Sequence, residues 1–148
     1  WPWTDEAFDK IMITNVKANH WLCRAVLPQM ADRKDGVVIV ISSISAFRGS
    51  GALGTYGMTK AAELAFVRNI AVEYGPDNIR VNAIAPGFIL TDMTEKLPDE
   101  VKKGWYDDIP MKRGGTPGEV AGVVVFLGSE LGQYVNGQVI NVCGGLQT

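Results

Sequence analysis

The sequence contains only two cysteines and one histidine in its 148 residues. Cys23 and Cys143 lie far apart and not in C-x-x-C spacing, which argues against both a disulfide framework and a zinc site. The lone histidine, His20, excludes a His-rich metal cluster. We therefore expect no metal centre, and a protein that works in a reducing, cytoplasmic compartment.

The sequence also lacks a strong charge of either sign and any long hydrophobic run. Its formal net charge is −2, so no basic field would recruit nucleic acid or anionic lipid. The apolar run at residues 37–41 is far shorter than the roughly 20 residues that span a bilayer. Nucleic acid and membrane are therefore not expected partners. A content of 47% hydrophobic residues is that of a folded globular protein rather than a disordered one.

Helical and strand patterns alternate along the chain. Apolar residues at helical spacing predict a helix over residues 5–30, with Pro28 breaking its last turn. The other expected elements are strands at 37–41, 79–84 and 139–142 and helices at 56–74, 99–107 and 118–129. Strands that alternate with helices are typical of βα units. We therefore expect one α/β domain over residues 1–148, built on a parallel sheet.

The expected strand at 37–41 has no polar side chain, which is typical of a parallel strand covered on both faces. Three strands are few for this many helices. By this count the strand lies at a sheet edge, a place that natural proteins seldom leave apolar and open. Two explanations stay open: further strands before residue 1 in a longer parent protein, or a second chain that covers this edge.

The most informative local pattern is the pair Tyr56 and Lys60 at the start of a predicted helix. Residues four apart on a helix lie on one face, about 5–6 Å apart at their Cβ atoms. A phenol ordinarily ionises near pH 10. A neighbouring ammonium and the positive end of the helix dipole both favour the phenolate. The pair therefore suits a general acid/base, although on its own it is also compatible with a half-buried tyrosine beside a solvated lysine.

Further motifs accompany this pair. Ser42 and Ser43 follow the apolar strand, at the edge where open parallel sheets bind ligands, and Ser43 lies thirteen residues before Tyr56. The other motifs are Asn15 in the first predicted helix, N-A-I-A-P-G at 82–87, P-G-F-I-L-T at 86–91 and a glycine-rich ending at 137–145. Together with Y-x-x-x-K, they resemble the short-chain dehydrogenase/reductase family across nearly all of the chain.

The resemblance implies hydride transfer between a nicotinamide cofactor, NAD or NADP, and a carbonyl or alcohol carbon. It implies a catalytic set of Asn15, Ser43, Tyr56 and Lys60. The implied cofactor-binding residues are Tyr56, Lys60, Pro86, Gly87, Ile89 and Thr91. Ser45, Phe88 and Trp105 would contact a small apolar substrate, and the nearest likeness within the family is to carbonyl reductases.

Roles follow from the same resemblance. Ser43 would hydrogen-bond the substrate oxygen, and Tyr56 would give or take its proton. Lys60 would favour the phenolate and hold the nicotinamide ribose, while Asn15 would fix a water that links Lys60 to solvent. Family members also pack the helices equivalent to 5–30 and 56–74 between subunits, so a homo-oligomer, either a dimer or a tetramer, is expected.

The resemblance is partial. Family members place a T-G-x-x-x-G-x-G turn after their first strand and an N-N-A-G segment after their fourth, and neither occurs here. The chain resembles the C-terminal three-fifths of a member, a doubly wound, Rossmann-like sheet without its first four strands, and Cys143 stands where the ending usually has aspartate. Two functions remain open: an NAD(P)-dependent oxidoreductase, and a non-catalytic fragment that serves assembly. Titration with NADH and NADPH would discriminate them.

Overall fold

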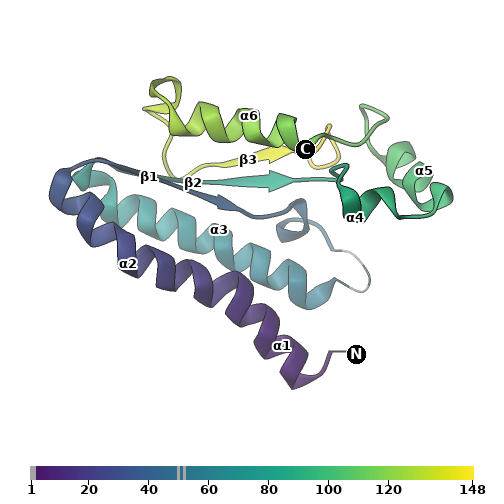
Figure 1. The fold of residues 1–148 in the computed structure, drawn as a ribbon, viewed down its shortest axis with the longest axis horizontal. Helices are drawn as coiled ribbons and strands as arrows, with labels where there is room; N and C mark the ends of the chain where they lie inside the picture. Colours follow the sequence, from purple (N-terminus) through teal and green to yellow (C-terminus); the bar gives the residue numbers. More distant parts are fainter. Residues whose placement is uncertain (1–2, 50, 52) are drawn as a thin grey trace.

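The computed structural model describes residues 3–49, 51 and 53–148, and these form an α/β arrangement (Figure 1). In chain order the helices are α1 (Asp5–Met12), α2 (Ala18–Arg33), α3 (Gly54–Tyr74), α4 (Asp92–Glu95), α5 (Asp99–Asp108) and α6 (Pro117–Gly128). The strands are β1 (Gly36–Ile41), β2 (Ile79–Pro86) and β3 (Val139–Val142). The predicted alternation of helices and strands is confirmed. Within the described residues, no helix is both long and apolar enough to cross a membrane.

The three strands form one parallel sheet in the order β1-β2-β3. Gly36 pairs with Ile79 at one end of the β1–β2 ladder, and Ile41 pairs with Ile84 at the other. The order places β1 at an edge of the sheet, as the sequence predicts. Because the strands are parallel, their C-terminal ends lie together on one side of the molecule, beside the N-terminal end of α3 and near α4 and α5 (Figure 1).

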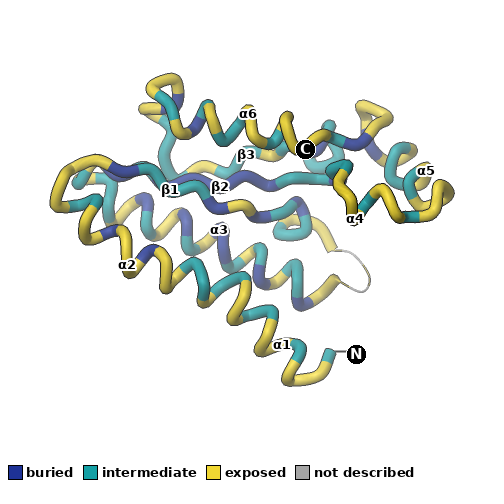
Figure 2. The backbone as a smooth tube through the Cα atoms, viewed as in Figure 1, coloured by how far each residue is buried: buried dark blue, intermediate teal, exposed yellow. Residues whose placement is uncertain are grey.

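Helices cover the two faces of this sheet: α2 and α3 lie on one face and α6 on the other, while α1 lies on the same side as α3 but beyond the strands (Figure 1). The central strand β2 is the most deeply buried element (Figure 2). The main core lies between the sheet and the helix pair α2–α3, and its buried members are Cys23, Leu27, Val40, Leu64, Val67, Ala71, Ile79, Val81 and Ala83. This packing holds the N-terminal end of α3 against the C-terminal ends of the strands.

The first helix differs from the prediction in two respects. A π-helical turn, Ile13–Lys17, interrupts it, so residues 5–33 form two helices rather than one. Pro28 does not break the last turn, because α2 continues through it to Arg33. Leu27, directly before the proline, is buried in the core, and this packing offsets the hydrogen bond that proline cannot donate.

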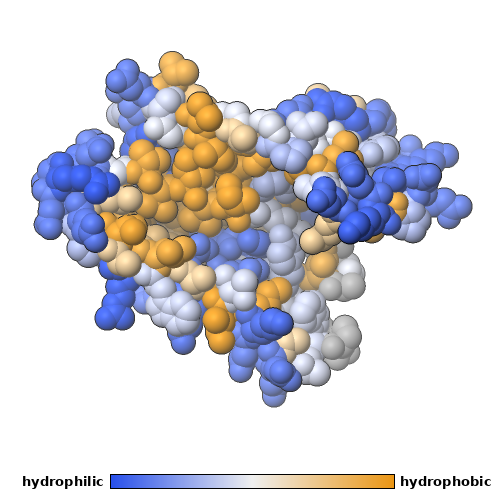
Figure 3. All heavy atoms as spheres, in the orientation of Figure 1, coloured by the Kyte–Doolittle hydropathy of each residue, from blue (hydrophilic) through white to orange (hydrophobic). Residues whose placement is uncertain are grey.

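Strand β1 is less covered than its composition predicts. Of its apolar residues only Val40 is buried, and Ile41 is 47% exposed. Figure 3 shows apolar residues gathered on the surface where β1 crosses between α2 and α6. The expectation of full coverage is therefore wrong for Ile41, and residues 37–39 are only half-buried, because β1 has a neighbouring strand on one side only and its other edge is open.

Candidate active site

The predicted catalytic residues lie where the C-terminal end of β1 meets the first turns of α3. Ser42 and Ser43 directly follow β1. The Ser42 hydroxyl donates to the Lys60 carbonyl oxygen at 3.0 Å. The Ser43 hydroxyl oxygen accepts from the Ser45 amide at 3.1 Å, at the start of the 3-10 turn Ile44–Ala46. Accepting this bond orients the Ser43 side chain and leaves its hydroxyl proton available for another oxygen.

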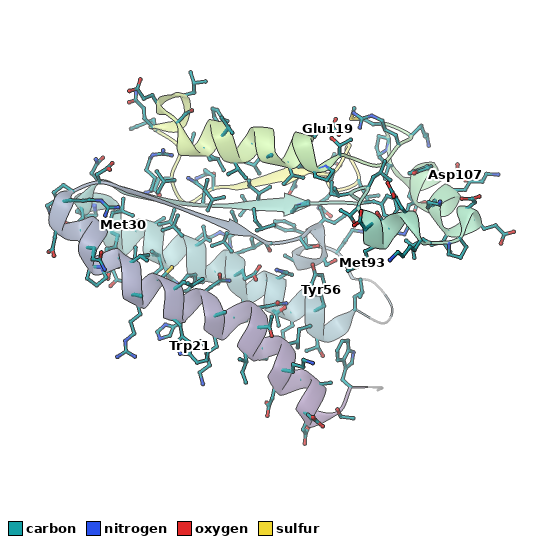
Figure 4. The ribbon with its side chains drawn as sticks, viewed as in Figure 1. Trp21, Met30, Tyr56, Met93, Asp107 and Glu119 are labelled. Atoms are coloured by element: carbon teal, nitrogen blue, oxygen red, sulfur yellow. The ribbon has the colours of Figure 1, made fainter. Side chains whose placement is uncertain are left out.

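Tyr56 lies in the N-terminal part of α3, at the end that faces the loop after β1 (Figure 4). Lys60 follows four residues later on the same side of the helix. The Lys60 ammonium nitrogen is 5.7 Å from the centre of the Tyr56 ring. It donates to the carbonyl oxygen of Ile41, the last residue of β1, at 3.1 Å. The Lys60 side chain is only 12% exposed. A positive charge is thus held beside the Tyr56 phenol in partly desolvated surroundings, where its influence is greater than in open water.

A glycine permits the close approach of α3 to the loop that carries the serines. A Cβ atom on Gly57 would lie 2.8 Å from the Ser45 carbonyl oxygen, closer than real Cβ atoms come to backbone. The absence of a side chain at Gly57 therefore fixes the spacing between the Tyr56 end of α3 and the serines.

We expect Gly57→Ala to lower the free energy of unfolding by about 1–2 kcal/mol, since overpacking outweighs the gain in helix propensity. The matched control is Gly122→Ala in α6, where a Cβ would meet nothing within 4 Å. The control should instead raise stability by up to about 1 kcal/mol. Urea denaturation measures both variants, and equal gains in the two would contradict the close-approach argument.

Asn15 lies in the π-helical turn between α1 and α2. Its side-chain amide donates to the Thr59 hydroxyl oxygen at 2.9 Å. The Thr59 hydroxyl in turn donates to the Tyr56 carbonyl oxygen at 2.7 Å, and Thr59 is fully buried. Asn15 is thus connected to the first turns of α3, which carry Tyr56, through Thr59, a residue that the sequence pattern did not single out.

The predicted cofactor-binding segment runs from the end of β2 to α4. The Gly87 amide donates to the Val142 carbonyl oxygen at 2.9 Å, and a Cβ on Gly87 would lie 2.7 Å from the Cβ of Cys143. Ile89 pairs with Gly115 through an isolated bridge. Thr91 is exposed and caps the N-terminus of α4. The segment that carries Pro86, Gly87, Ile89 and Thr91 is thereby fixed along the C-terminal edge of the sheet.

The predicted substrate residues line one pocket of about 160 Å³, which contains Ser43, Ser45, Gly87, Phe88 and Trp105. Phe88 and Trp105 stack, with ring centres 5.4 Å apart and an angle of 14° between the planes. Tyr106 meets Phe88 edge-on at 6.0 Å. The pocket is therefore lined by Ser43, which is predicted to be catalytic, and by two stacked aromatic rings.

The sequence of the chain is similar to those of known proteins. A family model described as enoyl-(acyl carrier protein) reductase matches residues 2–147. The 3-oxoacyl-[acyl-carrier-protein] reductase FabG of Chlamydia muridarum is 40% identical over 143 residues, which cover 97% of this chain and 58% of that protein. Dehydrogenase/reductase SDR family member 4 of Sus scrofa is 40% identical over 144 residues, covering 96% of this chain and 52% of that protein.

The chain belongs to the short-chain dehydrogenase/reductase family. A solved structure of a 7α-hydroxysteroid dehydrogenase, complexed with NADH and 7-oxo glycochenodeoxycholic acid, superposes with a TM-score of 0.93 at 34% identity. The match covers 98% of this chain and 57% of that one. The chain thus has the Rossmann-like α/β fold of the family and spans a little over half the length of the curated relatives it matches.

Membership of the family confirms the predicted resemblance to short-chain dehydrogenases/reductases. The structure brings Ser43, Tyr56 and Lys60 to one edge of the sheet and connects Asn15 to the Tyr56 backbone through Thr59. Their individual catalytic roles stay predictions. Within the described residues no three metal-ligating side chains converge.

The residues present fit the nicotinamide end of the family's cofactor. An ammonium group has three N–H donors, and Lys60 uses two of them on the Ile41 carbonyl oxygen and on Glu63. One donor is left for a ribose hydroxyl. The exposed Thr91 adds a further polar group on the same edge of the sheet.

Glu63 and Asn19 are the polar neighbours of this site that sequence reasoning missed. The Glu63 side chain is 2% exposed, and its Oε1 accepts from the Lys60 ammonium at 3.0 Å. Asn19 donates to the Asn15 carbonyl oxygen at 2.7 Å and lies 3.5 Å from Glu63 Oε1. Burial raises the pKa of Glu63 above its ordinary value of 4.5, although Lys60 acts in the opposite direction. The sequence offered one signal for Glu63: it is an acidic residue three positions after Lys60, and its neighbours along the predicted helix are apolar.

We expect Glu63→Gln to be more stable than the parent at neutral pH. A carboxyl whose pKa is raised by folding contributes stability below its unfolded pKa and loses it as the pH rises through its folded pKa. The advantage of the glutamine should therefore be absent below about pH 4.5, grow as the pH rises from there, and level off once the pH has passed the folded-state pKa. Urea denaturation of both proteins from pH 4 to pH 8 tests this, and an advantage that shrinks with rising pH would contradict it.

Proposed function

We propose that this chain carries the proton-transfer site of an oxidoreductase that interconverts a carbonyl and an alcohol. The observation that carries the proposal is the Lys60 ammonium, held between the Ile41 carbonyl oxygen and the Tyr56 ring at the C-terminal edge of the sheet. This arrangement places a fixed ammonium group beside the ring of Tyr56, the residue that would give or take the proton.

When bound, a nicotinamide cofactor, NADH or NADPH, would supply the hydride that a carbonyl carbon takes up in the reductive direction. Ser43 donates its hydroxyl proton in a hydrogen bond to the substrate oxygen, where negative charge develops. Tyr56 transfers its phenolic proton to that oxygen, and Lys60 stabilises the phenolate left behind. In the oxidative direction the Tyr56 phenolate takes the proton back. The residues that would hold the cofactor are Tyr56, Lys60, Pro86, Gly87, Ile89 and Thr91.

We also propose that the substrate is a small, apolar carbonyl compound or the corresponding alcohol, as for a carbonyl reductase. The stacked rings of Phe88 and Trp105 support this, because they present an apolar wall to the pocket that contains Ser43. Stacked aromatic surfaces favour apolar parts of a ligand, while the serine supplies the polar contact for its oxygen.

The test of this function is a spectrophotometric assay on the polypeptide that carries this chain. NADH and NADPH are each offered with a panel of aliphatic and aromatic ketones and aldehydes. We expect oxidation of one of the two cofactors that depends on a carbonyl compound. Cofactor binding without turnover on any member of the panel would favour the non-catalytic alternative.

The helix face opposite the sheet supports a second proposal, that two copies of the chain associate through α2 and α3. Large apolar side chains on this face are exposed, among them Ile13, Trp21 and Leu22. An apolar hollow beside them is lined by Val16 and Phe66 among others. Burying such surface against a second copy is favourable. Sedimentation equilibrium should therefore show a dimer or tetramer. Trp21→Lys, which places a charge on this apolar face, should shift the association equilibrium towards smaller species.

A further inference from the structure

The buried position of the Glu63 carboxylate is unfavourable for the free energy of folding. Glu63 is on α3 within the core-facing side of the helix, and its Oε2 has no hydrogen-bond partner among the described residues. Taking an ionised carboxylate out of water costs several kcal/mol, and a single ion pair recovers only part of that cost. An apolar residue of similar size would stabilise the fold more in many such sites. We therefore look for a role of Glu63 other than stability in the groups that its side chain contacts.

Glu63 touches the ammonium of Lys60. The lysine stem is flexible, and each of its bonds can rotate. Two acceptors fix the ammonium from different elements: the Ile41 carbonyl oxygen at the end of β1 and Glu63 Oε1 one turn further along α3. With only the first acceptor, the ammonium could turn about that contact and leave the Tyr56 ring.

Asn19 connects the same carboxylate to the N-terminal helices. Its amide nitrogen lies 3.5 Å from Glu63 Oε1 and 2.7 Å from the Asn15 carbonyl oxygen. Asn15 belongs to the π-helical turn, where the regular hydrogen-bond ladder of the helix is interrupted and a carbonyl can take a side-chain donor. A path of side-chain contacts thus runs from Lys60 through Glu63 and Asn19 to the backbone of Asn15.

We propose that Glu63 is a positioning residue that holds the Lys60 ammonium beside Tyr56 and, with Asn19, ties it to the Asn15 turn through side-chain atoms. The proposal rests on the proposed function, in which Lys60 acts on Tyr56. Glu63 itself need not touch the substrate or the cofactor. The proposal adds to the predicted role of Asn15, which is to fix a water that links Lys60 to solvent. Side chains of the protein also link Lys60 to the turn that contains Asn15.

The experiment measures the reactivity of Lys60 directly. The chain is treated with acetic anhydride, and acetylation of Lys60 is followed by peptide mass spectrometry relative to the exposed Lys10. Glu63→Gln keeps the shape and an acceptor oxygen but removes the charge. We expect Lys60 to acetylate about tenfold faster in this variant, a change equivalent to about 1.4 kcal/mol. Glu63→Asp, which keeps the charge, should restore at least part of the protection.

The matched control is Glu73→Gln, an exposed glutamate on the same helix, which should leave Lys60 reactivity unchanged. Unchanged Lys60 reactivity in a folded Glu63→Gln would overturn the proposal, and it would do so whether or not the protein is an active enzyme.

Where carbonyl reduction is measurable, Glu63→Gln should also lower kcat and move the pH profile of kcat while leaving KM unchanged. A profile identical to that of the parent would again overturn it. Absence of activity in the parent counts only against the proposed function.

Discussion

Tyr56→Phe should lower carbonyl reduction by a factor of about 10²–10⁴ in the polypeptide that carries this chain, the range typical of a lost acid/base group. The substitution removes the transferable proton and leaves the ring in place beside Lys60. Since the ring packing is retained, we expect the unfolding midpoint to stay close to that of the parent. Steady-state kinetics with a reactive ketone, together with thermal unfolding, checks both expectations.

Tyr74→Phe is the matched control for this substitution. Tyr74 is the last residue of the same helix and packs against the core, at the opposite end of the helix from Tyr56. It should leave the rate of reduction nearly unchanged. A Tyr56→Phe enzyme that works within a few-fold of the parent would remove Tyr56 from its assigned role.

The 148-residue chain by itself should bind NADH at least about a hundredfold more weakly than the 7α-hydroxysteroid dehydrogenase that it resembles. Its sequence contains no glycine-rich turn of the kind that cradles a pyrophosphate at a helix N-terminus. Hydrogen bonds contribute about 0.5–1.5 kcal/mol each, and every 1.4 kcal/mol is tenfold in affinity. The loss of about three such contacts already accounts for the factor of a hundred.

Fluorescence titration of the purified chain with NADH and with NADPH measures this affinity, with the steroid dehydrogenase titrated in parallel. Size-exclusion chromatography of the same sample should show association, because β1 leaves an apolar strand edge open on one side. Micromolar binding of either nucleotide by a monomer would contradict the prediction.

The order and type of the main elements follow from the sequence because their patterns are local. A run of β-branched residues at Val37–Ile41 and the glycine and proline after Tyr74 are readable without tertiary information. The π-helical turn at Ile13–Lys17 is not, since no residue type specifies it. The same holds for Pro28, where core packing overrides the ordinary tendency of proline to end a helix.

The candidate site likewise contains residues that the sequence predicts and residues that it does not. Ser43, Tyr56 and Lys60 could be predicted because chemically distinctive residues recur at fixed spacings that a family shares. Glu63 and Asn19 could not, because a carboxylate and an amide 44 residues apart interact only after α2 and α3 pack together. Side-chain networks of this kind depend on helix packing, for which no short motif exists.

Deuterium transfer tests the central claim most directly, that Ser43, Tyr56 and Lys60 form a site for carbonyl reduction. The polypeptide that carries this chain is incubated with NADH or NADPH deuterated at the transferable position of the nicotinamide, together with the ketone panel. Mass spectrometry then locates the label in the product. We predict an alcohol that carries deuterium on its carbinol carbon, formed by the parent and at least a hundredfold more slowly by Tyr56→Phe. Binding of the cofactor and ketone without any labelled alcohol, or equal labelling by the parent and Tyr56→Phe, would contradict the claim.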